Sequence, residues 1–180
     1  VIDLRTEEER EQKPDPAEKL GGVRFYDIPI FSQEALGVTF GGGDNLVKGL
    51  EDLMQDPVGV MSKLYSEMVL DSHSQQGFAS FFDVLLEQSD GSVLWHCTLG
   101  KDRVGIATYL LLNALGVSEE IATEDYLATN KFLDSPVQKI VNEMVKFPLP
   151  SSVKKAIRVV DSADIRFLQA ARDSIVAEYG

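Results

Sequence analysis

The stretch that decides the fold lies near the middle of the chain: Ser92-Val93-Leu94-Trp95-His96-Cys97-Thr98-Leu99-Gly100-Lys101-Asp102-Arg103-Val104. Its first four residues follow the turn Ser89-Asp90-Gly91 and form an apolar run, which predicts a short buried strand. The residues from Val104 to Leu115 are almost all apolar and have helix length, so we expect a buried helix that ends at Gly116. The loop between them joins the carboxyl end of a strand to the amino end of a helix, where α/β sheets place ligands.

Patterns on both sides of this stretch complete the expected fold. Val1–Leu4 and Val23–Ile30 have the β-branched and apolar composition of short strands, and Pro29 marks the end or the edge of the second one. Helical spacing or capping residues predict helices over residues 6–12, 44–52, 56–69, 78–86, 119–133, 137–145 and 163–179. We predict an α/β fold with a small, mostly parallel central sheet flanked by helices.

The bulk composition limits the classes of function. A length of 180 residues with 44% hydrophobic residues fits one domain over residues 1–180, and 29 acidic against 17 basic residues leave no basic face for nucleic acid. One cysteine and two histidines exclude an internal disulfide and provide no zinc-type ligand set. Because no apolar run has the length of a membrane helix, we expect no stable membrane insertion, and both a cytoplasmic and a secreted location stay open.

The central loop has the composition of an anion cradle. Backbone N–H groups from Thr98 to Arg103 can point inward around a dianion, and the dipole of the following helix favours negative charge there. Arg103 adds a planar guanidinium that can hold two oxygens at once. The same positive surroundings stabilise a thiolate, so we expect Cys97 to be a nucleophile at neutral pH. The expected binding residues are Thr98, Leu99, Gly100, Lys101, Asp102 and Arg103.

Other interpretations of the loop compete with this one. A lone cysteine between a strand and a helix is often only a small buried hydrophobic residue. A nucleotide-binding phosphate loop needs a glycine where the chain has Trp95 and a serine or threonine where it has Asp102. A cysteine protease needs a histidine base, for which His73 is the free candidate. We expect His96 to support the loop behind Cys97 through a hydrogen bond.

The motif His-Cys-x-x-Gly-Lys-Asp-Arg, from His96 to Arg103, resembles that of the bacterial atypical tyrosine phosphatase family. Members of this family have a cysteine-phosphatase-like fold and act on phosphotyrosine, sometimes on phosphoserine or phosphothreonine, and on phosphoinositides. The family's usual opening segment and short C-terminal tail are not in this sequence, so we expect a fragment of a longer protein. The resemblance covers nearly the whole chain, through Val1-Ile2-Asp3-Leu4-Arg5 with Glu7-Glu8-Glu9-Arg10, Tyr26-Asp27-Ile28-Pro29-Ile30, Leu64-Tyr65, Asp125-Tyr126-Leu127 with Asn130, Phe167-Leu168 and Glu178-Tyr179-Gly180.

The resemblance implies phosphomonoester hydrolysis without a metal or a cofactor. Cys97 would attack phosphorus to form a cysteinyl phosphate, while Arg103 and the loop amides would bind the equatorial oxygens. Lys101 would add charge for polyanionic inositol headgroups, and Asp102 would serve in proton transfer; a surface ion pair is the simpler interpretation of these two residues. A phosphorylated protein or a phosphoinositide would be the substrate, and the phosphate ion would be a ligand.

One residue departs from the family pattern. Val104 stands where the family usually has threonine or serine, whose hydroxyl can hydrogen-bond the cysteine sulfur and help it leave. We predict that phosphate binding and the first step survive while the second step is slowed, with Thr98 compensating in part. A phosphate-binding pseudophosphatase with impaired turnover is therefore one alternative, and a thiol redox or sulfur-transfer enzyme is another.

Several carboxyl groups are candidates for the general acid. A leaving phenolate or alkoxide needs a proton, so we expect a carboxylic acid within hydrogen-bond reach of it. The candidates are Asp102 in the loop, and Asp44 and Glu34 in the segment after the second strand. Asp44 is more simply explained as a helix N-cap, and Asp27 as a structural residue within a strand.

Overall fold

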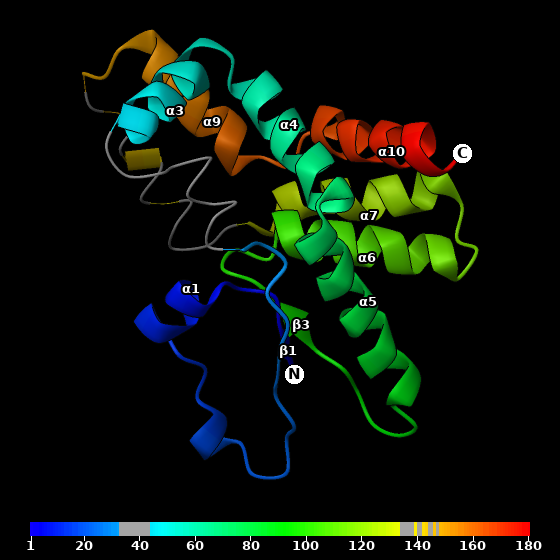
Figure 1. Cartoon of the computed structure of the whole chain (residues 1–180). Helices are drawn as coiled ribbons and strands as arrows, with labels where there is room; N and C mark the ends of the chain where they lie inside the picture. The colour runs from blue at the N-terminus through cyan, green and yellow to red at the C-terminus, as the bar shows by residue number, and fades with distance from the viewer. Residues whose placement is uncertain (33–43, 134–138, 140–141, 144–145, 147) are drawn as a thin grey trace.

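A three-stranded parallel sheet lies at the centre of the computed structural model, which describes residues 1–32, 44–133, 139, 142–143, 146 and 148–180. The strands are β1 (Ile2–Asp3), β2 (Tyr26–Asp27) and β3 (Trp95–His96), in the order β2-β1-β3. Ile2 of the central strand is in register with Tyr26 on one side and Trp95 on the other. Helices flank this sheet, which confirms the predicted α/β class (Figure 1).

The helices surround the sheet unequally. Figure 1 shows α1 on one side of the strands and a larger body of helices, including α5, α6, α7 and α10, on the other. The single-turn 3-10 helix η1 follows α1 in the chain. The described helices are α1 (Glu7–Gln12), η1 (Ala17–Lys19), α3 (Asp44–Gln55), α4 (Pro57–Leu70), α5 (Ser72–Glu87), α6 (Asp102–Ala114), α7 (Glu119–Phe132), α9 (Ser151–Asp161) and α10 (Ile165–Tyr179).

Side-chain caps set where several helices begin. Thr6 accepts a hydrogen bond from the Glu9 amide while the Glu9 carboxylate accepts one from the Thr6 amide, so a complete capping box starts α1. Asp56 accepts from the Gly59 amide at 3.0 Å, with Pro57 as the first residue of α4. Gly116, with a φ of 76°, follows the end of α6 at the predicted position.

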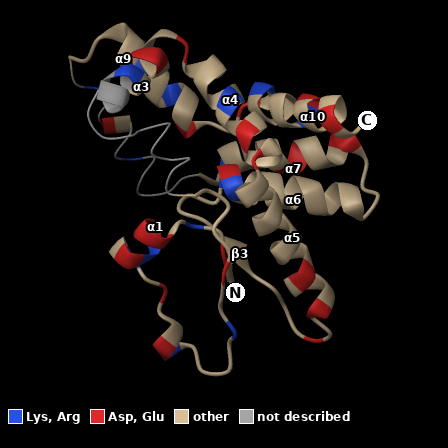
Figure 2. Cartoon of the chain, viewed as in Figure 1, with Lys and Arg blue, Asp and Glu red and all other residues tan. Residues whose placement is uncertain are grey.

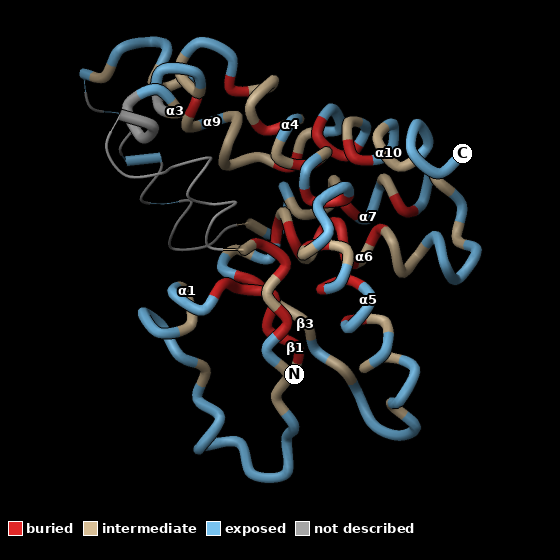
Figure 3. Tube along the Cα trace, viewed as in Figure 1, coloured by how far each residue is buried: buried red, intermediate tan, exposed pale blue. Residues whose placement is uncertain are grey.

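The core lies between the sheet and the inner faces of the helices. Buried residues concentrate along the strands and along one side of α4, α6 and α10 (Figure 3). Ile2 and Leu4 of the central strand are fully buried. The ring of Tyr65 on α4 packs against Phe167 on α10 and Tyr126 on α7, with centroids 5.5 Å and 6.3 Å apart. Three helices are thereby joined around one buried tyrosine.

The structure corrects some predicted bounds. β3 is Trp95–His96 rather than residues 92–95. The first hydrogen bond between β1 and β3 runs from the amide of Ile2 to the carbonyl of Leu94, so the pairing of the two strands begins there. Residues 104–115 are not buried throughout, since a helix at the surface packs only one face against the core, and Leu115 is 70% exposed. α9 was not predicted, and residues 137–145 fall mostly outside the described part of the chain.

The backbone of Asp44 is already helical, so this residue is the start of α3 rather than its N-cap, and α3 runs three residues beyond the predicted end. The side chain of Asp44 and the whole of Glu34 lie outside the described residues. Among the helices that the structure describes, none combines the length and the apolar composition that crossing a bilayer requires.

Candidate active site

The loop after β3 curls back into a helix instead of running on as a strand. Cys97 directly follows β3 and is 9% exposed, residues 98–101 form bends, and α6 begins at Asp102. Gly100 has a φ of 68°, a left-handed conformation that glycine adopts without strain and that reverses the chain here. Within the described residues, the amides of Thr98, Leu99, Gly100 and Lys101 donate no backbone hydrogen bond. They are therefore available to a ligand at the amino end of α6.

The guanidinium of Arg103 is held by a carboxylate from the other side of the sheet. Arg103 is 9% exposed, and its Nη1 and Nη2 atoms donate to Glu9 at 2.5 Å and 2.7 Å. The Thr98 hydroxyl also donates to Glu9 and lies 3.4 Å from Nη2 of Arg103. The ring of Phe31 packs against the guanidinium, 5.7 Å from centroid to Cζ. Arg103 is thus oriented by contacts on several sides.

The ionisation of Glu9 follows from these contacts. Burial alone would raise the pKa of the carboxyl, but the hydrogen bonds from Arg103 and Thr98 outweigh it and lower the pKa to about 2. Burial of Arg103 opposes its charge, whereas the Glu9 hydrogen bonds and the Cys97 sulfur favour it, and its pKa is raised.

The sequence did not reveal Glu9 as a site residue. Its visible signal was Thr6-x-x-Glu9, the signature of a helix cap, and the structure shows that the same carboxylate serves both purposes. Glu9 accepts from the Thr6 amide at 2.9 Å while it binds Arg103. The cap therefore fixes the carboxylate that in turn fixes the arginine.

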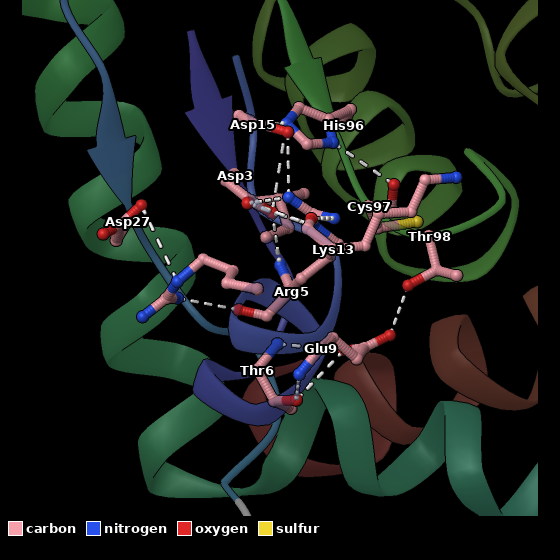
Figure 4. A network of polar contacts seen from close by, with 12 residues as sticks. Asp3, Arg5, Thr6, Glu9, Lys13, Asp15, Asp27, His96, Cys97 and Thr98 are labelled. Carbon is pink, nitrogen blue, oxygen red and sulfur yellow. Dashed lines mark hydrogen bonds and ion pairs between the residues drawn. The ribbon is translucent and has the colours of Figure 1, made fainter. Parts of the chain in front are cut away.

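A second carboxylate from the same N-terminal segment reaches His96 (Figure 4). Nε2 of His96 lies 2.9 Å from Asp15 Oδ2, and Nδ1 lies 3.2 Å from the carbonyl oxygen of Cys97. Arg5 links Asp15 to the buried Asp3, donating to the two carboxylates at 2.9 Å and 2.7 Å. His96 thus contacts the carbonyl of Cys97 and is anchored from outside the loop.

Asp3, Asp15 and His96 bring their ligand atoms within 4.8 Å of one another, which is close enough to hold a cation. The guanidinium of Arg5 already supplies the positive charge there, because its Nε donates to both oxygens of Asp3 at 2.9 Å and 3.0 Å. The cluster is therefore explained as an ion-pair network.

Lys101 and Asp102 do form an ion pair, but it is not the surface pair that was the simpler expectation. Lys101 is 1% exposed, and its Nζ donates to Asp102 Oδ1 at 2.5 Å and to the Ser162 carbonyl at 3.4 Å. The Tyr65 hydroxyl donates to the same Oδ1 at 2.6 Å and receives a hydrogen bond from Tyr126 at 3.0 Å. Burial, followed by the charge of Asp102, raises the pKa of Tyr65 well above its usual value.

The remaining predicted residues occupy varied positions. Thr98 and Gly100 are exposed, Leu99 is half-buried, and Val104 packs against the core from the first turn of α6. Asp27 lies on β2 with its side chain 62% exposed and pairs with Arg10, in agreement with a structural role. His73 is on α5, and its Nε2 is buried without a partner among the described residues.

Charge and comparison with known proteins agree with a site for an anion on an otherwise acidic molecule. Acidic residues predominate on α1 and α5 (Figure 2), whereas the loop contributes Lys101 and Arg103 alongside Asp102. A sequence model of the tyrosine phosphatase family matches residues 1–180, the whole chain. The chain belongs to the tyrosine phosphatase family. This membership confirms the resemblance inferred from the loop.

Individual tyrosine phosphatases are similar over parts of the chain. A tyrosine-protein phosphatase of Nostoc commune is 30% identical over 133 residues, which cover 74% of this chain and 40% of that protein. The triple specificity protein phosphatase PtpB of Mycobacterium tuberculosis is 28% identical over 97 residues, covering 49% of this chain and 35% of that protein. The matched part thus spans about two fifths or less of the length of either relative.

Proposed function

We propose that this chain hydrolyses phosphate monoesters through a cysteinyl-phosphate intermediate at Cys97. The observation that carries the proposal is the loop itself: a buried cysteine and an oriented arginine flank unbonded amides at the amino end of a helix. Such a loop binds a dianion and stabilises a thiolate with the same positive charges. Arg103 and the amides supply the positive charge that a metal ion supplies in other phosphatases, so none is required.

The reaction proceeds in two displacements. The Cys97 thiolate attacks phosphorus, the P–S bond forms, and the bond from phosphorus to the leaving oxygen breaks as that oxygen takes a proton from the Asp102 carboxyl. A water molecule then gives a proton to the Asp102 carboxylate and attacks phosphorus, the S–P bond breaks, and phosphate leaves while the thiolate is restored. Arg103 binds the equatorial oxygens in both steps, and the loop amides share this role.

Asp102 is the proposed proton-transfer group. Its Oδ1 accepts from both Lys101 and Tyr65, and the described residues donate no hydrogen bond to its Oδ2. Oδ2 is therefore the oxygen available to a leaving group or a water. Because Lys101 is buried, its charge acts through Asp102 and not by direct contact with a headgroup at the surface. The proposed substrates are phosphorylated proteins, with phosphotyrosine as the main target residue, or phosphoinositides.

Phosphate release from phosphotyrosine peptides and from phosphoinositide vesicles tests the proposal. The native chain should hydrolyse at least one of them, and both Cys97→Ser and Arg103→Lys should abolish the activity. Activity that survives Cys97→Ser would overturn the cysteinyl-phosphate mechanism. Thiol-dependent activity that survives Arg103→Ala would favour a redox or sulfur-transfer enzyme, and vanadate binding without turnover would favour a pseudophosphatase limited by Val104.

A further inference from the structure

Both ring nitrogens of His96 contact oxygen atoms that can only accept hydrogen bonds. Nε2 lies 2.9 Å from a carboxylate oxygen of Asp15, and Nδ1 lies 3.2 Å from the carbonyl oxygen of Cys97 (Figure 4). A neutral imidazole has one N–H, so one of the two contacts would bring two lone pairs together. Both contacts are favourable only when both nitrogens carry a proton. Two donors on the ring would satisfy both contacts.

The charges around His96 agree with this state. Asp3 faces it from β1 at 4.0 Å, Asp15 faces it from the segment before η1, and Arg5 bridges these two carboxylates. The two carboxylates and one guanidinium sum to a net charge of −1, and a protonated His96 brings the cluster to zero. Asp3 is 3% exposed and Arg5 6%, so neutrality matters because uncompensated charge is costly in a buried cluster.

We propose that Asp15 is a positioning residue for the chemistry at Cys97. Its carboxylate keeps His96 doubly protonated and fixed in orientation, and the imidazolium in turn holds the Cys97 carbonyl and places a positive charge beside the nucleophile. The catalytic part of this inference rests on the proposed function. Asp15 is separated from His96 by 81 residues and from the loop by two strands, so its role arises only in the folded chain.

NMR spectroscopy measures the protonation of His96 directly. The chain has two histidines, so labelling with ¹⁵N-histidine gives two ring systems in a long-range ¹H–¹⁵N correlation spectrum, and His73→Gln assigns them. In the wild type at pH 7, the two ring nitrogens of His96 should have nearly equal ¹⁵N chemical shifts, both in the range of protonated imidazole nitrogens. One protonated and one unprotonated nitrogen would overturn the proposal without any variant of Asp15.

The effect on the nucleophile is measured by alkylation. Cys97 is the single cysteine, so the rate of reaction with iodoacetamide at pH 6.5 reports on this sulfur alone. Asp15→Asn should convert His96 to a neutral tautomer and slow alkylation about tenfold, the factor that corresponds to about 1.4 kcal/mol. Asp15→Glu, which keeps the carboxylate, should restore most of the rate.

Asp27→Asn is the matched control, because Asp27 lies in the same region and pairs with Arg10 instead of His96. It should leave both the ring spectrum and the alkylation rate unchanged. An Asp15→Asn protein with wild-type spectrum and rate would refute the proposal. Phosphate release by the wild type tests the proposed function, whereas the spectra and the alkylation rates test this inference, so the two can fail separately.

Discussion

Replacing Glu9 by glutamine should lower the free energy of unfolding of this chain, and the size of the decrease should depend on pH. The folded-state pKa of Glu9 is about 2 against an ordinary value of 4.5. The difference of about 2.5 pH units corresponds to about 3 kcal/mol in the free energy of unfolding. Because the carboxylate is favoured in the folded chain, this contribution is complete above pH 4.5 and is lost as the pH falls from 4.5 toward 2.

Glutamine can keep the capping box and one hydrogen bond to Arg103, so Glu9→Gln removes the charge together with the second hydrogen bond. Urea unfolding of the wild type and of the variant should differ by about 3 kcal/mol at pH 7, and the difference should narrow steadily between pH 5 and pH 3. The variant should also lose about tenfold to a hundredfold in kcat/KM, because Arg103 is less firmly oriented.

Glu8→Gln is the control. Glu8 is in the same first turn of α1 and is exposed, with Gln12 as its hydrogen-bond partner at 3.2 Å. Glu8 interacts with the same helix dipole as Glu9 but does not contact the loop. Removing its charge should therefore change the free energy of unfolding and the turnover little at any pH. A difference between wild type and Glu9→Gln that is independent of pH would refute the charge-based reasoning, as would an equal effect of Glu8→Gln.

Three further predictions concern the loop and the residues packed against it. Gly100→Ala should lower the free energy of unfolding by about 1 kcal/mol in urea titrations, because φ is 68° there although an added Cβ meets no atom within 4 Å; an unchanged midpoint would contradict this. Tyr65→Phe should lower the free energy of unfolding by about 1–3 kcal/mol, because it removes a 2.6 Å hydrogen bond to Asp102 and the acceptor of the Tyr126 hydroxyl. Thermal unfolding measures this change, and a variant as stable as the wild type would show that the hydroxyl is dispensable. Val104→Thr should raise steady-state turnover and reduce the burst of phosphoenzyme in rapid-quench experiments; no burst in the wild type together with unchanged turnover in the variant would show that Val104 does not slow the second step.

The local structure of the loop was predictable because its parts are contiguous. Cys97, Gly100 and Arg103 lie within seven residues, between an apolar strand pattern and an apolar helix pattern, so local spacing already places them together. The parallel sheet and most helices followed from capping residues and periodicity for the same reason. α9 carries a marked amphipathic pattern and lies outside the predicted helices, whereas the bounds of β3 depend on where its neighbour β1 begins.

The amino-acid sequence by itself determined the strand-loop-helix that joins Cys97 and Arg103, because this unit depends on residues close along the chain. Only the tertiary structure decided which side chains support them: Glu9 binds Arg103 across 94 residues, Asp15 binds His96 across 81, and Tyr65 binds Asp102 across 37. These partners belong to elements whose local signals predict only caps, turns and core positions. Packing brings them to the loop, and separations of this length leave no periodic trace in the sequence.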